Sequence, residues 1–88
     1  MNFFITVALV QAMFANIEVP AAKQALMGFV NATHDAGVDT VHCAGPDVTF
    51  NDLAILIYPV IQQSDPKANA AQVALKAMAA AYPCGSNL

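Results

Sequence analysis

Apolar side chains recur every three or four residues along most of this chain, which is the spacing of one face of an α-helix. The clearest stripe lies in the segment 49–63 and consists of Phe50, Leu53, Leu56, Ile57, Val60 and Ile61. β-Branched residues cluster only at 38–41 and 48–49, and these runs are too short for a sheet. The pattern therefore predicts an all-α fold.

Four helices are predicted, and together they form one compact domain over residues 1–88, a length typical of a single domain. Their approximate ranges are 3–15, 20–36, 49–63 and 69–82. Because the turn between the third and fourth helices is short, we expect these two to pack as an antiparallel hairpin.

Residues at the ends of these segments have the chemistry of helix caps. Pro20 suits a first helical turn, where its missing N–H costs nothing. Thr49 and Asp52 have the spacing of a capping box, and Asn69 is a suitable N-cap. Gly37 is expected to end the second helix in a left-handed conformation.

Pro59 lies inside the third predicted helix. A proline there removes one backbone hydrogen bond and clashes with the carbonyl of the preceding turn. We therefore expect a kink, or an early 3₁₀ end, at this position.

The segment 3–15 is apolar except for Thr6 and Gln11, and it has two interpretations. It is either a cleaved signal peptide or a first helix that is buried all round. The absence of Lys and Arg before it favours the retained helix. Any part left uncovered would be an exposed apolar patch, and we expect such a patch to form the seam of a homodimer. No apolar run is long enough for a transmembrane span.

The composition excludes several classes of protein. The chain is 58% hydrophobic and only 10% charged, which argues against disorder. Its cations are Lys23, Lys67 and Lys76, and its net charge is −3, so it has no basic surface for nucleic acid or for an anionic membrane. An alanine-rich core of this size gives marginal stability, so we expect support from a disulfide or a partner subunit.

The two cysteines, Cys43 and Cys84, are placed to form such a disulfide. Cys43 precedes the third predicted helix, and Cys84 follows the fourth. In an antiparallel hairpin these two ends meet, so a bridge is geometrically natural, and it is typical of small proteins in an oxidising compartment. The alternative is a pair of free buried thiols in a cytosolic protein.

No set of residues indicates catalysis, a metal site or a cofactor. His42 is next to Cys43 in sequence, but a bridged cysteine offers no nucleophile. A zinc site built from His34, His42, Cys43 and Cys84 would have no standard spacing and would compete with the disulfide. We expect His34 to be a solvated helix residue and His42 a loop residue, and we expect no enzyme activity.

Recognition is expected from the loop 38–48, with Gly45-Pro46-Asp47 as its turn, and from the turn 62–69, because loops on a rigid scaffold commonly carry binding. The candidate partner-binding residues are Asp39, His42, Asp47, Gln62, Gln63 and Asp65.

Several short motifs follow one another between Lys23 and Cys84: Gly28-Phe29-Val30-x-x-x-x-Asp35-Ala36, Val41-x-Cys43-x-x-Pro46-x-Val48-Thr49, Leu53 with Ile57, Pro66, Ala74-Leu75 and Tyr82-Pro83-Cys84. In order and spacing they resemble the type VI secretion amidase-immunity (Tai) proteins. The resemblance implies an all-helical, disulfide-bonded protein that is secreted across the inner membrane into the periplasm. It also implies a Cys43–Cys84 bridge and a partner that is a peptidoglycan amidase or a similar cell-wall hydrolase, blocked without catalysis by this chain.

Two other functions remain as alternatives at this stage. One is a holdase chaperone similar to the HdeA acid-stress proteins, which are also small, helical and disulfide-bonded; the few charges of this chain give acid little to act on. The other is a structural or assembly subunit that oligomerises through the apolar segment 3–15.

Overall fold

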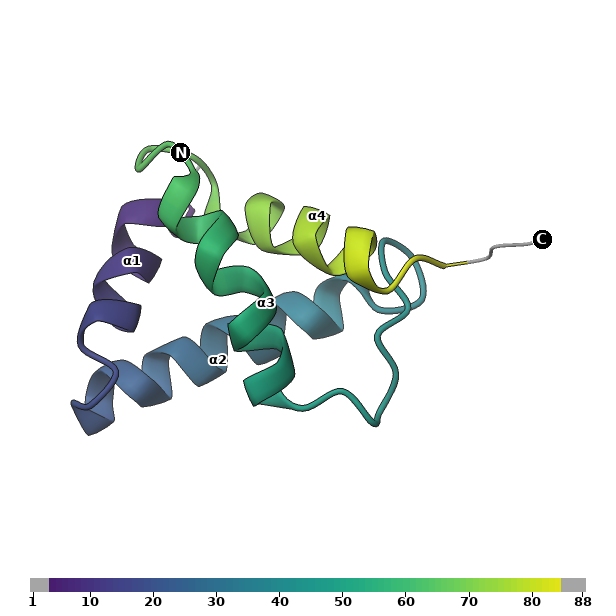
Figure 1. Cartoon of the computed structure of the whole chain (residues 1–88), viewed down its shortest axis with the longest axis horizontal. Helices are drawn as coiled ribbons and strands as arrows, with labels where there is room; N and C mark the ends of the chain where they lie inside the picture. The colour runs from purple at the N-terminus through teal and green to yellow at the C-terminus, as the bar shows by residue number, and fades with distance from the viewer. Residues whose placement is uncertain (1–3, 85–88) are drawn as a thin grey trace.

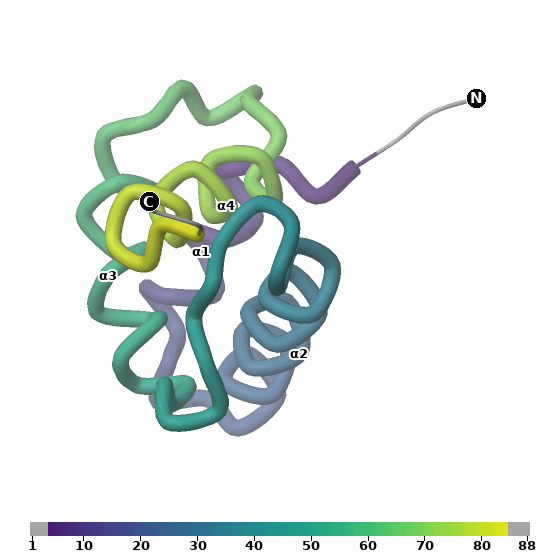
Figure 2. Tube along the Cα trace, turned by 90° about the vertical axis from the view of Figure 1, so that its right-hand side faces the viewer, coloured from purple at the N-terminus to yellow at the C-terminus, as the bar shows by residue number. Residues whose placement is uncertain are grey.

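The computed structural model describes residues 4–84, and within them the chain forms four helices and no β-strand. The helices are α1 (Val7–Ala15), α2 (Pro20–Gly37), α3 (Phe50–Gln63) and α4 (Ala70–Ala81). They pack into a compact all-α domain (Figures 1 and 2), which confirms the predicted fold class.

The core lies where the four helices meet, and α3 and α4 share the most extensive contact. The predicted stripe of α3 supplies Leu53, Ile57 and Ile61, all buried. Opposite it, α4 buries Ala70, Ala74, Ala77 and Met78, so three of its four buried residues are alanines. Alanine buries little area per side chain, and this core therefore gains less from the hydrophobic effect than its number of residues suggests.

Side chains cap three of the helices. At α3, Asp52 N–H donates to Thr49 Oγ1 at 3.2 Å, and Thr49 N–H donates to Asp52 Oδ2 at 3.0 Å, which completes the predicted capping box. At α4, Asn69 Oδ1 accepts from Gln72 N–H at 3.2 Å, as predicted. Thr6 Oγ1 accepts from Leu9 N–H at 3.3 Å at the start of α1.

The first helix begins at Val7, later than predicted, because the residues before it pair with the α3–α4 turn. Ala70 N–H donates to Ile5 O, Val7 N–H to Ala68 O, and Ala8 N–H to Pro66 O, each at 2.9 Å. The turn thus satisfies N–H groups that a helix start leaves without partners. Phe3, the predicted start, lies outside the described residues.

The expectation that the first helix is buried all round is wrong. Only Val7, Val10 and Phe14 of α1 are buried, while Leu9 remains 48% exposed. These three side chains belong to the main core, so α1 is part of the fold. No helix in residues 4–84 is long and apolar enough to cross a membrane.

Pro59 does not end α3 early. The helix continues in α conformation to Gln63. Both Pro59 and Ile55, the residue whose carbonyl loses its partner, are exposed, so solvent is available to the unpaired carbonyl.

Gly37 is required for close packing and not for a left-handed conformation, which corrects the sequence-based expectation. The positive φ in this turn is at Asp39, with φ of 66°. A Cβ on Gly37 would lie 2.5 Å from Leu75 Cδ2, 3.2 Å from His42 Cδ2 and 3.3 Å from Val41 Cβ. The end of α2 therefore meets α4 and the following loop so closely that a side chain at position 37 would require Leu75, His42 and Val41 to shift.

The two glycines of α2 provide a matched test of this packing. Gly28→Ala adds a methyl group that meets nothing within 4 Å, so helix propensity should raise the free energy of unfolding by about 0.5–1 kcal/mol. Gly37→Ala should lower it by about 1–2 kcal/mol, because overpacking outweighs the same gain. Urea unfolding followed by circular dichroism measures both, and an equal rise for the two variants would contradict the account.

Candidate functional site

Cys43 and Cys84 form a disulfide, as predicted. Their Cα atoms lie 4.9 Å apart, and the bridge joins residues separated by 41 positions. Beside it, Cys43 N–H donates to Tyr82 O at 2.7 Å. The bridge thus fastens the loop before α3 to the end of α4.

The loop that follows α2 is organised around one carbonyl. Gly37 O accepts from the N–H groups of Thr40, Val41 and His42 at 3.1, 2.8 and 3.2 Å. The Thr40 hydroxyl donates to the same oxygen at 3.1 Å. The chain therefore folds back on the end of α2, which brings His42 against it.

His42 is fully buried, and both of its ring nitrogens have partners. Ala44 N–H donates to His42 Nδ1 at 3.1 Å, so Nδ1 carries no proton. His42 Nε2 then donates to His34 O at 3.0 Å. The ring is a neutral, structural tautomer that ties α2 to the loop, and it presents no surface to a partner.

His34 lies beside it, with ring centroids 4.9 Å apart. Its side chain is only 20% exposed, so it is not the solvated residue expected from sequence. His34 Nε2 donates to Ala44 O at 2.9 Å, and Nδ1 to Asp35 Oδ1 at 3.1 Å. The Ala44 carbonyl first, and the Asp35 carboxylate second, raise the pKa of His34 against the opposing effect of burial.

His34 and His42, with their hydrogen bonds to Ala44 and to the His34 carbonyl, join the end of α2 to the loop that follows it; we call this structural unit the His34–His42 corner. The thiol beside the histidines is consumed by the disulfide, and no free cysteine occurs in the part of the chain that the structure describes. Across residues 4–84, no three His, Cys, Asp or Glu side chains come together in a way that would hold a metal ion.

The other predicted partner-binding residues are exposed but lie on two separate surfaces. Asp39 and Asp47 belong to the loop that the disulfide fastens to the end of α4. Gln62 and Gln63 end α3, and Asp65 follows in the turn that pairs with the start of α1, beyond the other end of α4 (Figure 1).

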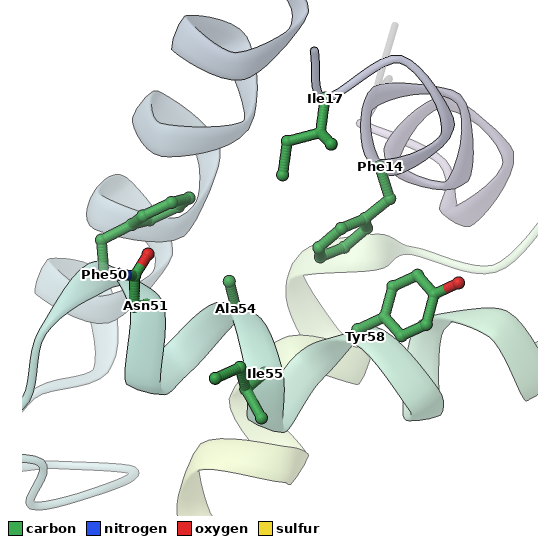
Figure 3. Close-up of a pocket in the computed structure, with 7 residues that line it drawn as sticks. All are labelled: Phe14, Ile17, Phe50, Asn51, Ala54, Ile55 and Tyr58. Carbon is green, nitrogen blue, oxygen red and sulfur yellow. The ribbon is translucent and has the colours of Figure 1, made fainter.

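An apolar groove of about 460 Å³ lies between the end of α1 and the first half of α3 (Figure 3). Its lining is Phe14, Ile17, Phe50, Asn51, Ala54, Ile55 and Tyr58. The Phe14 and Tyr58 rings meet edge to face, with centroids 5.0 Å apart. One feature of the sequence indicates this groove: Ile55 and Tyr58 are large apolar residues off the buried stripe of α3.

A second groove, of about 580 Å³, is lined by residues before and within α1, by α2 and by the start of α4. Small residues form much of the part contributed by α2. Its lining is Phe4, Ile5, Met13, Ala25, Gly28, Phe29, Ala32, Thr33, Ala36, Asn69 and Ala71.

A small disulfide-bonded helical domain with open apolar grooves has the form of a binding protein. The family model of Rap1a immunity proteins matches residues 7–84, from the first residue of α1 to the second cysteine of the bridge. Neither a search of curated proteins nor one of solved structures finds a significant match.

The match covers nearly the whole chain, and the protein belongs to the Rap1a immunity protein family. It is therefore a non-catalytic immunity protein, an inhibitor that binds its cognate type VI secreted effector. The resemblance to type VI amidase-immunity proteins is confirmed at the level of an immunity family, in preference to a chaperone or an assembly subunit.

The raised pKa of His34 makes a prediction about stability and pH. Because the folded pKa exceeds the ordinary value of 6.5, the stabilisation by protonated His34 is fully present below that value and is lost as pH rises through the folded pKa. The amide of His34→Gln can still donate to Ala44 O but carries no charge. Relative to wild type, this variant should therefore lower the free energy of unfolding more near pH 5.5 than near pH 8.5.

Urea unfolding at both pH values measures this difference. Asp35→Asn, which removes the second group that raises the pKa, should show a smaller change in the same direction. A cost of His34→Gln that is independent of pH would contradict the assigned charge.

Proposed function

We propose that the effector neutralised by this protein is a peptidoglycan amidase, and that the inhibition takes place in the periplasm. The observation that carries the proposal is the Cys43–Cys84 disulfide. Disulfides persist in oxidising compartments such as the bacterial periplasm and are rare in the cytosol, where thiols are kept reduced. An inhibitor with a structural disulfide is therefore suited to meet its effector outside the cytosol.

A periplasmic site of inhibition suits an effector that cleaves peptidoglycan. Peptidoglycan lies on the outer side of the inner membrane, so an enzyme that cleaves it must be blocked there. The motifs between Lys23 and Cys84 resemble those of amidase-immunity proteins in order and spacing, which supports an amidase over other cell-wall hydrolases. The inhibitor acts by occupying a surface of the enzyme and excluding substrate.

The loop 38–48, through Asp39 and Asp47, is the part of the predicted contact set that we retain for this role. Both aspartates are exposed, and the disulfide and the Gly37 carbonyl hold the loop in place, so little conformational entropy is lost on binding. His42 is excluded by its burial. We assign Asp65 to the fold, because its side chain accepts from Lys67 N–H at 2.9 Å within the turn that holds α1.

The proposal includes a homodimer through the exposed apolar side of α1. Phe4, Ile5 and Leu9 are between 39% and 50% exposed, which leaves a patch that a second copy would cover. Leu9→Glu should then shift the protein from dimer to monomer in analytical ultracentrifugation without loss of helix content. A wild-type protein that sediments only as a monomer at micromolar concentration would remove the dimer.

The target assignment is tested with purified enzymes and purified peptidoglycan. The oxidised protein should abolish hydrolysis by one type VI amidase from a representative panel when the two are equimolar, and should leave an unrelated muramidase active. Release of new amino groups from the peptidoglycan measures amidase activity. Inhibition of the muramidase alone, or of no amidase, would contradict the assignment.

A further inference from the structure

The apolar groove between the end of α1 and the first half of α3, called the α1–α3 groove below, presents large apolar side chains to solvent. Ile55 is 74% exposed and is the most exposed large hydrophobic residue in the described part of the chain. Tyr58 is 48% exposed on the same helix, and Ile17 points into the groove from the turn after α1 (Figure 3). Covering such side chains contributes about 25 cal/mol for each Å² of apolar area removed from water.

The shape and lining of the groove favour a protruding apolar side chain. The Phe14 and Tyr58 rings close one end, Phe50 closes the other, and Ala54 forms a shallow floor between them (Figure 3). Asn51 is the only lining residue with a polar side chain other than the Tyr58 hydroxyl. A well-packed apolar centre with little polar competition is the usual setting of a binding hot spot.

Three acidic residues lie close in sequence to residues that line this groove. Asp52 follows Asn51, Asp47 lies in the turn just before α3, and Glu18 follows Ile17; all three are exposed. The chain has no Lys or Arg between Lys23 and Lys67, a stretch that contains five of its six acids. Asp47 and Asp52 therefore form an acidic rim without a neighbouring cation in sequence.

We propose that the effector docks in the α1–α3 groove, through a segment that places a large apolar side chain in the groove and a Lys or Arg at the rim formed by Asp47 and Asp52. The apolar side chain provides most of the affinity, and the opposite charges select the partner and speed its association. This inference rests on the immunity function and names the surface that performs it.

A second copy of this chain does not fit the same groove. A symmetric contact through this groove would place Asp47 and Asp52 of both copies in one interface, with like charges and no cation supplied by the groove itself. A basic segment suits the proposed target, because the peptide stems of peptidoglycan carry free carboxylates that an amidase cleft must accommodate. In the proposed complex, Asp47 and Asp52 compete with the carboxylates of the substrate for the basic residues of the enzyme.

The experiment is a protection assay in the bacterium that encodes the protein. Recipient cells that lack the gene express full-length variants and are challenged by sibling cells with an active type VI system. Periplasmic levels and disulfide formation are matched to wild type on non-reducing gels. Ile55→Asp should lower recipient survival by about tenfold or more. Val60→Asp, the control at an exposed apolar residue of α3 outside the groove lining, should protect as wild type does.

The rim is tested by a second pair of variants. Asp47→Asn combined with Asp52→Asn should lower survival, while the side-chain amide introduced at position 52 can still accept from Thr49 N–H and preserve the cap. Asp65→Asn, which removes one charge from the α3–α4 turn, should not. Full protection by Ile55→Asp, or equal loss with Val60→Asp, would overturn docking in the groove. Loss with Asp65→Asn but not with the rim variant would move the contact to the turn and would also overturn it.

The result is independent of what the effector cleaves. Protection is scored without knowledge of the reaction, so a negative result at Ile55 leaves the amidase assignment in place. Conversely, failure of the amidase panel leaves the docking surface intact, because survival still reports on effector binding.

Discussion

The Cys43–Cys84 disulfide is the constraint on which the rest of this structure depends. The core is small, and α4 contributes mainly alanines to it. Such a core recovers little hydrophobic free energy against the conformational entropy of the ordered chain. The bridge raises the free energy of unfolding by reducing the conformational entropy of the unfolded chain. In the folded protein it lies where the end of α2, the loop 38–48 and the end of α4 meet.

The two ends of α4 are held by different interactions. At its C-terminal end, the disulfide and the His34–His42 corner hold the loop that leads into α3. At its N-terminal end, residues 5–8 pair with the α3–α4 turn through backbone hydrogen bonds. With both ends fixed, α3 is held against α1, and the groove between these helices is a preformed surface that needs little reordering on binding.

The parts of the fold that depend on local sequence were predictable. The stripe of α3, the Thr49–Asp52 capping box and the Asn69 cap each involve residues a few positions apart, and the disulfide followed from the lengths of two helices and one turn. The errors concern long-range contacts. Nothing near α1 in sequence shows that the α3–α4 turn supplies acceptors to its first N–H groups, and nothing near Gly37 shows that Leu75 lies against it.

The same distinction holds for the functional surface. The sequence predicted binding by loops, and it placed His42 among the contacts. The His42 side chain is instead fully buried, with hydrogen bonds to the His34 carbonyl and the Ala44 amide, and this removes it from the contact surface. The groove was missed because its lining comes from two segments far apart in the chain, residues 14–17 and 50–58. Ile55 and Tyr58, apolar but off the buried stripe, are the features that identify it.

The stability of a protein of this size and composition depends on one bridge. This dependence is tested most directly by urea unfolding of the oxidised protein and of the Cys43→Ala/Cys84→Ala double variant under identical conditions. Because the bridge joins residues 41 positions apart, the variant should lose about 4 kcal/mol of unfolding free energy. A double variant that unfolds at the same urea concentration as the oxidised protein would contradict the account.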